Sequence, residues 1–136
     1  MLALTFPGGN FVTDIDSITL ANNTLLNHDI IVPVGKRWVL LSIKAMNPDN
    51  VNRDISFNIY NEAAATNLAK HLDTRTIATT AQMYWPNNGT GGEDRSNIPH
   101  LVIMSGGQLL RIIFAAGGAS AGGTDADGVV ITYLEL

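Results

Sequence analysis

Residues 24–59 read TLLNHDIIVPVGKRWVLLSIKAMNPDNVNRDISFNI, and this stretch decides the fold class. It contains three segments rich in β-branched and aromatic residues, and such segments between turns are typical of β-strands. The segments are residues 24–32, 36–46 and 54–59. Pro33 and Pro48 mark the two turns, each at the second position that a type I turn favours for proline. The stretch therefore predicts three consecutive strands.

The hydrophobic pattern predicts which side of each strand is buried. In residues 54–59 apolar and polar residues alternate, as in a strand with one face in the core. In residues 36–46 the odd positions are all apolar, and we expect these side chains to face the core: Val39, Leu41, Ile43 and Ala45. The short Asn-Pro-Asp-Asn turn between the two segments predicts that they form an antiparallel hairpin.

The rest of the chain continues the same pattern. Further strands are predicted at residues 74–85, 101–104, 109–114 and 129–136, and the second and third of these form another hairpin. Residues 61–72 are the one helical candidate, because Asn61 suits an N-cap and alanines follow; a structured loop is the alternative. Residues 86–97 and 117–128 are predicted loops. The sequence predicts an all-β protein, an antiparallel β-sandwich of jelly-roll or Greek-key type with about seven or eight strands and at most one short helix.

The composition indicates a single domain with little charge on its surface. The chain has 136 residues, a net charge of -4 and 15% charged residues, whereas a typical soluble domain has about 25%. This length fits one domain at residues 13–136, preceded by an extension at residues 1–12. We expect neighbouring subunits to cover part of so neutral a surface, with ordinary variation in composition as the alternative.

Several function classes leave signatures that this sequence lacks. The mild acidity argues against nucleic-acid binding, which needs clustered Lys and Arg. No apolar run is long enough for a membrane span, and the first residues have no basic region of a signal peptide. We therefore expect neither nucleic acid nor membrane as a partner, and synthesis in the cytoplasm.

The residues that could carry chemistry are isolated from one another. His28, His71 and His100 lack the spacing of a metal site, and the chain has no cysteine. Residues 124–128, TDADG, lack the remaining ligands of a calcium loop and fit a turn entering the last strand. No Gly-x-Ser-x-Gly elbow or phosphate-binding loop is present. We predict a protein that is not an enzyme and has no catalytic residues, no metal and no cofactor.

Two groups of residues are candidates for binding. The extension carries four large apolar side chains around Pro7-Gly8-Gly9, namely Leu2, Leu4, Phe6 and Phe11. We expect them to bind a partner, with packing on the open end of their own domain as the alternative. The second group places aromatic rings beside amides, as a sugar-binding site would, and consists of Tyr84, Trp85, Asn87 and Asn88. The alternative is that an aromatic ring fills the end of the sandwich.

Three motifs resemble those of small virion proteins of tailed bacteriophages. Residues 29–40, DIIVPVGKRWVL, look like their V-P-x-G-K-x-W strand–turn–strand. Residues 99–112, PHLVIMSGGQLLRI, are similar to their hairpin with a G-D-x-L turn, although Gln108 replaces the usual acidic residue. Residues 128–136, GVVITYLEL, resemble their closing Y-x-E strand. The resemblance covers roughly residues 25–136.

The resemblance implies a capsid decoration (cement) protein or a related β-sandwich protein of the phage head or tail. Such a protein is structural, binds the outside of the assembled head and is commonly a trimer. Its implied partners are other copies of itself and the major capsid protein. The alternative function is a carbohydrate- or receptor-binding module of a phage fibre that uses the aromatic and amide residues named above.

Overall fold

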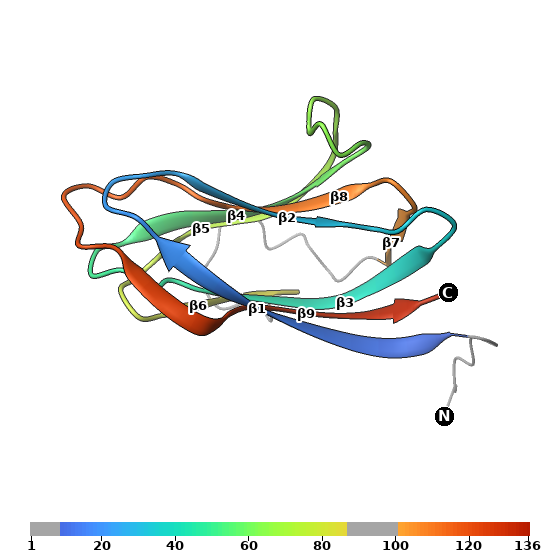
Figure 1. Cartoon of the computed structure of the whole chain (residues 1–136), viewed down its shortest axis with the longest axis horizontal. Helices are drawn as coiled ribbons and strands as arrows, with labels where there is room; N and C mark the ends of the chain where they lie inside the picture. The colour runs from blue at the N-terminus through green and yellow to red at the C-terminus, as the bar shows by residue number, and fades with distance from the viewer. Residues whose placement is uncertain (1–8, 87–100) are drawn as a thin grey trace.

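The computed structural model describes residues 9–86 and 101–136, which form nine β-strands and no helix. The strands are β1 (Asn10–Leu20), β2 (Leu26–Ile31), β3 (Arg37–Met46), β4 (Arg53–Tyr60), β5 (Leu68–Ile77), β6 (Gln82–Trp85), β7 (Val102–Ser105), β8 (Leu109–Phe114) and β9 (Gly123–Glu135). They make two antiparallel sheets that lie face to face (Figure 1). The prediction of an all-β, antiparallel β-sandwich is confirmed.

The two sheets have four and five strands. Sheet A has the order β1-β9-β3-β6, with β7 also paired to β3, and sheet B has the order β2-β8-β4-β5. The chain crosses between the sheets at most of its connections, so strands next to one another in sequence are rarely hydrogen-bonded. Only β4 and β5 are both consecutive and paired.

Both predicted hairpins are therefore wrong. Strands β3 and β4 lie in different sheets, and so do β7 and β8. A short turn is long enough to span the roughly 10 Å between two packed sheets, so turn length alone does not tell a hairpin from a crossing. At the first crossing, the buried Asn47 side chain donates hydrogen bonds to the carbonyls of Val51 and Ile77, at 2.8 and 3.0 Å.

The predicted helix at residues 61–72 is also wrong, and its alternative, a loop, holds for the first half. The carboxylate of Glu62 accepts hydrogen bonds from the backbone N–H groups of Thr66 and Asn67, at 2.7 and 2.8 Å, and from the Thr66 hydroxyl. Ala65 has a φ of 54°, outside the helical region. From Leu68 onward the chain pairs with β4, because that pairing supplies the backbone bonds that so short a helix would leave unmade.

A β-bulge changes which side of β3 is buried. The register with β9 shifts between Leu40 and Ser42. Before the bulge the even residues Trp38 and Leu40 face the core, and after it the odd residues from Ile43 onward do so. The prediction that all odd positions face the core therefore fails at Val39 and Leu41, of which Leu41 is 38% exposed, because an extra residue in a strand reverses the alternation.

Strand boundaries differ from the prediction in three further places. Residues 10–20 form β1, which the sequence analysis did not assign as a strand. The predicted loop at 117–128 ends early, because β9 already begins at Gly123. The predicted strand at 74–85 is two strands, β5 and β6, with a turn between them in which Thr80 has a φ of 57°.

The core lies between the sheets and is made of the inward side chains of both. Phe57, Phe114, Ile43 and Ile131 have no exposed surface. The rings of Trp38 and Tyr133 stack with their centroids 3.9 Å apart. These residues supply much of the stability of a domain that has no cysteine, since each buried aromatic or branched side chain contributes roughly 1.5–3 kcal/mol.

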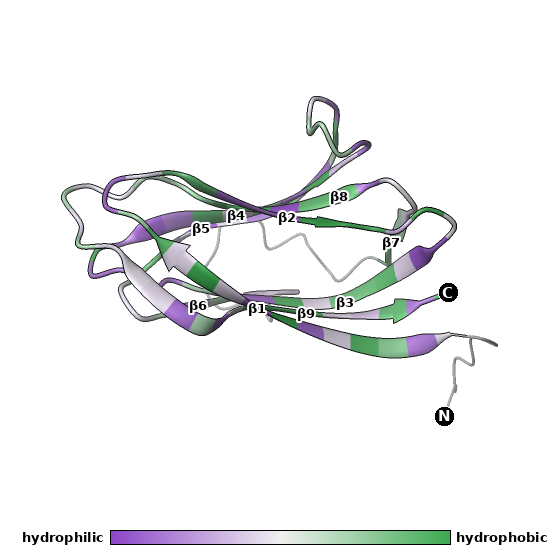
Figure 2. Ribbon diagram, in the orientation of Figure 1, coloured by the Kyte–Doolittle hydropathy of each residue, from purple (hydrophilic) through white to green (hydrophobic). Residues whose placement is uncertain are grey.

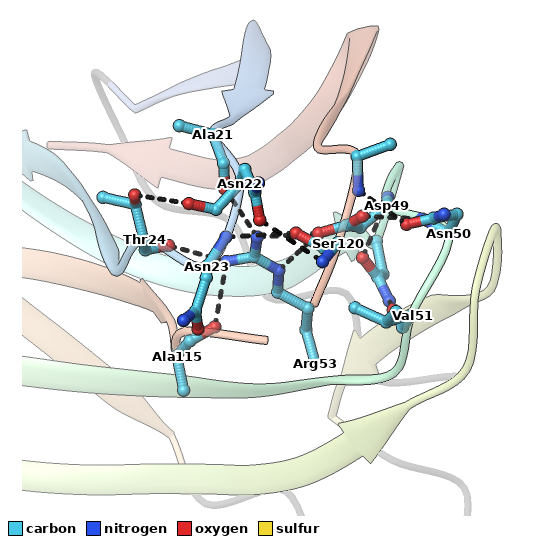
Figure 3. Close-up of polar contacts among 12 residues, drawn as sticks. Ala21, Asn22, Asn23, Thr24, Asp49, Asn50, Val51, Arg53, Ala115 and Ser120 are labelled. Atoms are coloured by element: carbon cyan, nitrogen blue, oxygen red, sulfur yellow. Dashed lines mark hydrogen bonds and ion pairs between the residues drawn. The ribbon is translucent and has the colours of Figure 1, made fainter. Parts of the chain in front are cut away.

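A buried arginine forms hydrogen bonds with three loops at one end of the sandwich (Figure 3). The Arg53 guanidinium donates to the Asp49 carboxylate, with Nε 2.8 Å from Oδ2. It also donates to the backbone carbonyls of Thr24, Ala115 and Ala21, at 2.7, 3.1 and 2.8 Å. The loops after β1, β3 and β8 are therefore held by one side chain.

The charge on Asp49 is stabilised by this cluster. Burial raises the pKa of the Asp49 carboxyl, but hydrogen bonds from Arg53, from the Asn50 backbone N–H and from Ser120, together with the Arg53 charge, outweigh burial. The pKa of Asp49 therefore lies below its usual value, and the buried pair is ionised at neutral pH.

Candidate interaction surfaces

The outer face of sheet A is apolar. Of the ten large hydrophobic side chains exposed in the described part of the chain, six lie in sheet A or directly before β7. We call these residues the apolar face: Phe11, Ile15, Leu41, Tyr84, Leu101 and Ile103. Their sequence neighbours, such as Val12, Met83 and Met104, pack in the core, so alternation turns the six outward.

Strand register aligns these side chains in rows across the sheet. The first row is entirely apolar and runs through Phe11, Leu134, Val39 and Ile103. Its two ends are 78% and 50% exposed, whereas the two central side chains are buried although they point away from the core. The next row contains only hydroxyl side chains, Thr13, Thr132 and Ser42. A third row, Ile15, Val130, Lys44 and Tyr84, carries the single charge of the three.

The N-terminal end of the described chain lies on this same face. A Cβ atom added to Gly9 would be 3.0 Å from the side chains of both Leu134 and Leu136. Gly9 therefore lies beside the outward leucines at the end of β9, where β1 begins. Of the four extension residues predicted to bind a partner, Phe11 lies in β1, whereas Leu2, Leu4 and Phe6 are outside the described residues.

Strand β1 forms one edge of sheet A, and its charged side chains point toward sheet B. The Tyr133 hydroxyl donates to Asp14 at 2.9 Å, and His28 of sheet B lies 2.9 Å from Asp16. Burial and the Asp14 hydrogen bond raise the pKa of Tyr133. The outward side chains of β1 are uncharged, so this long edge lacks the lysines that commonly protect an edge from pairing.

The outer face of sheet B is organised by hydrogen bonds instead. Four polar residues face one another in register across all four strands, and we call them the polar row: Asp29, Arg111, Asn58 and His71. Arg111 donates two hydrogen bonds to Asp29, from Nε at 2.7 Å and from Nη2 at 2.8 Å. The Asp29 hydrogen bond raises the pKa of Arg111.

Of the predicted sugar-binding residues, the two that the structure describes, Tyr84 and Trp85, point to opposite sides of β6. Trp85 is 5% exposed and packs in the core, so the alternative that an aromatic ring fills the sandwich is confirmed for Trp85. Tyr84 is 54% exposed, and its hydroxyl donates to Gln82 on the apolar face. Asn87 and Asn88 lie outside the described residues.

Sequence reasoning missed Ile15, Ile103 and the polar row. The outward residues of β1 alternate with an inward set that contains two aspartates, so hydropathy alone does not show which set is buried. The polar row depends on the register of three strand pairs, which no local pattern encodes. The sequence offered one hint of the polar row, namely that Asp29 and Arg111 are oppositely charged residues within two otherwise apolar strands.

Within residues 9–86 and 101–136, no group of three or more His, Cys, Asp or Glu side chains could hold a metal ion. The same residues contain no helix that is long and apolar enough to cross a membrane. A comparison with models of known protein families and with curated protein sequences finds no match.

Proposed function

We propose that this chain is a structural protein of a tailed-phage virion, without enzyme activity, that binds the outside of the assembled head and stabilises it. The observation that carries the proposal is the apolar, nearly uncharged outer face of sheet A. Large exposed apolar side chains gathered on one face of a small soluble domain mark a site of association. The motifs that resemble those of decoration proteins favour the phage head as the assembly that this face binds.

The strand order supports the same family of structures. Eight strands in the orders β1-β9-β3-β6 and β2-β8-β4-β5 are what a jelly roll built from two Greek keys would give. Strand β7 then continues the edge position of β6 along β3, since the two strands pair with different halves of β3. We infer that this is a jelly roll with an excursion inside one edge strand.

Attachment would use the apolar face together with the extension. The row from Phe11 to Ile103 lies at the end of the sheet where Gly9 contacts Leu134 and Leu136. Leu2, Leu4 and Phe6 continue the same apolar character toward the N-terminus. A trimer seated on capsid subunits would bury these side chains against the shell and against neighbouring copies, with about 800 Å² typical for each partner in a stable interface.

The proposal is tested by binding to shells. The chain should copurify with intact phage particles and should rebind to shells stripped of it. Deletion of residues 1–8, which leaves β1 whole, should weaken rebinding while circular dichroism and the melting temperature stay nearly unchanged. Ile103→Lys should weaken it as well. Full rebinding by both variants, or no association with particles, would refute the proposed function.

A further inference from the structure

We propose that the outer face of sheet B binds a neutral saccharide. The proposed site consists of the polar row and of the apolar residues beside it, which we call the apolar band: Ile31, Leu109, Tyr60 and Leu68. If sheet A is held against a shell, sheet B faces outward, because the two sheets are opposite sides of one sandwich (Figure 1). The outward orientation of sheet B on a shell rests on the proposed function, whereas saccharide binding by the chain itself does not.

The charges of the site cancel, which favours a neutral ligand. Asp29 and Arg111 form a bidentate pair, with side chains 34% and 20% exposed. An anionic ligand would compete with Asp29 for the guanidinium, whereas a hydroxyl group could add to the pair. Two of the five N–H donors of Arg111 are used on Asp29, and each carboxylate oxygen keeps a further lone pair.

The other half of the row has fixed hydrogen-bond directions. His71 Nδ1 lies 2.7 Å from Asn58 Oδ1, which only accepts, so Nδ1 carries the proton. In the neutral ring, Nε2 then accepts from the Thr74 hydroxyl at 3.1 Å. The Asn58 amide donates to Ser56 at 3.2 Å, which leaves the Ser56 hydroxyl proton free to point outward. Ordered donors and acceptors of this kind match sugar hydroxyls, which both donate and accept.

The apolar band lies directly beside the row, and its exposed ends are suited to the C–H face of a sugar ring. Ile31 and Leu68 at these ends are 49% and 51% exposed, whereas Leu109 between them is buried. The Arg111 guanidinium lies over the Tyr60 ring, 5.5 Å from its centroid, so this cation–π contact joins the polar row to the apolar band. Figure 2 shows hydrophobic and hydrophilic segments next to one another along β2 and β8.

A loop forms a wall at the same end of the site. Residues 61–67 rise above sheet B, away from sheet A (Figure 1). The three hydrogen bonds to Glu62 keep this loop closed, and Gln108 donates to Asn61 at 3.3 Å. Hydrogen bonds from Thr66 and Asn67 hold the pKa of Glu62 below its usual value, so the carboxylate that accepts these bonds is ionised at neutral pH. A preformed wall reduces the ordering cost of binding.

The test uses the isolated chain and a printed array of neutral, sialylated and sulfated oligosaccharides, followed by NMR titration with the strongest neutral ligand. Wild type should bind neutral glycans and shift backbone amides of β2, β4, β5 and β8. The double variant Asp29→Asn/Arg111→Gln, which removes both charges and leaves an amide at each position, should lose affinity at least about tenfold, because hydrogen bonds to charged groups are the strong ones. His71→Ala, at an exposed position, should weaken binding too.

Matched controls keep the outcome clear. Tyr84→Ala, on the opposite face, should leave glycan binding unchanged, and all variants should keep the wild-type circular dichroism. Binding of no glycan, binding of anionic glycans only, loss of binding in Tyr84→Ala, or full affinity in both sheet B variants would each overturn the inference. Shell rebinding by the double variant should remain normal, so failure here is distinguishable from failure of the proposed function.

Discussion

The outer faces of the two sheets differ although both belong to the same sandwich. The row of sheet A from Phe11 to Ile103 is apolar from end to end, and its hydroxyl neighbours carry no charge. The corresponding row of sheet B joins an ion pair to an amide–imidazole pair. An apolar face gains stability from burial but discriminates little between partners, so it is suited to permanent contact. Polar groups with fixed hydrogen-bond directions are suited to selective and reversible contact.

The difference shows where the scarce charge of this chain is used. Asp14 and Asp16 of β1 point inward, toward Tyr133 and His28, and so leave the outer face of their own strand neutral. On sheet B, Asp29 and Arg111 point outward and neutralise one another. These few charged side chains are therefore used in specific pairs, and the low charge content does not mean that the whole surface lacks specific polar groups.

The two outer faces exist only while the sheets stay packed against each other, and the largest expected loss of stability comes from replacing Arg53, the residue that joins their loops. Arg53→Ala leaves Asp49 charged and buried without its partner and frees three carbonyls. We expect the free energy of unfolding to fall by about 3–5 kcal/mol. Urea unfolding measures this loss.

Arg37→Ala is the matched control for Arg53→Ala, because Arg37 is exposed at the start of β3. It should change the free energy of unfolding by no more than about 0.5 kcal/mol. A comparable loss in both variants would show that the cluster at the loop end has no special role.

A second prediction concerns the pH dependence of the same cluster. The pKa of Asp49 is lower in the folded chain than the 3.8 of an aspartate in an unfolded chain, so the folded state binds fewer protons than the unfolded state near that pH. The stabilisation is complete above the unfolded pKa and is lost as the pH falls through the folded pKa. Wild type should therefore lose stability below about pH 4, and its advantage over Asp49→Asn should shrink there. An advantage that stays constant into strong acid would contradict this assignment.

A third prediction separates the apolar face from exposed apolar residues in general. Ile103→Lys should reduce self-association and shell binding at least about tenfold, or about 1.4 kcal/mol, because it places a charge in an otherwise apolar row. Val34→Lys makes the same change at a side chain that is 92% exposed in the turn between β2 and β3, and should have little effect. Analytical ultracentrifugation and shell rebinding measure both. Equal effects of the two variants would show that net charge matters and the face does not.

Much of the fold was predictable because strands and turns are local features. The alternation at Ile55, Phe57 and Ile59 is correct in the structure, and all three side chains are buried. The partners of each strand were not predictable, since a turn such as that at Asn47 serves a crossing as well as a hairpin. The bulge near Leu41 was hidden for a related reason, because the residues on both sides of β3 are apolar there.

The candidate surfaces were less predictable than the fold. Phe11 was singled out by its hydrophobicity, but its row forms only when β1, β9, β3 and β7 are assembled in register. Trp85 illustrates the opposite case, because an aromatic residue beside a polar loop suggested a ligand and the side chain lies in the core. Local sequence shows which residues could act, whereas strand register determines which of them meet.

The smallest expected effect tests whether the polar row is a site or a structural brace. In a double-mutant cycle with Asp29→Asn and Arg111→Gln, the coupling free energy for unfolding should be only about 0.2–1 kcal/mol, because both side chains are partly exposed to water. High salt should reduce it further, since exposed charges are screened. A coupling above about 2 kcal/mol would mean that the pair mainly holds β2 against β8, and such a brace would resist rearranging around a ligand. A small coupling, combined with a large loss of glycan affinity in the same double variant, would separate the two roles: the fold does not need this pair, and its two side chains are held in place on the outer face for another molecule.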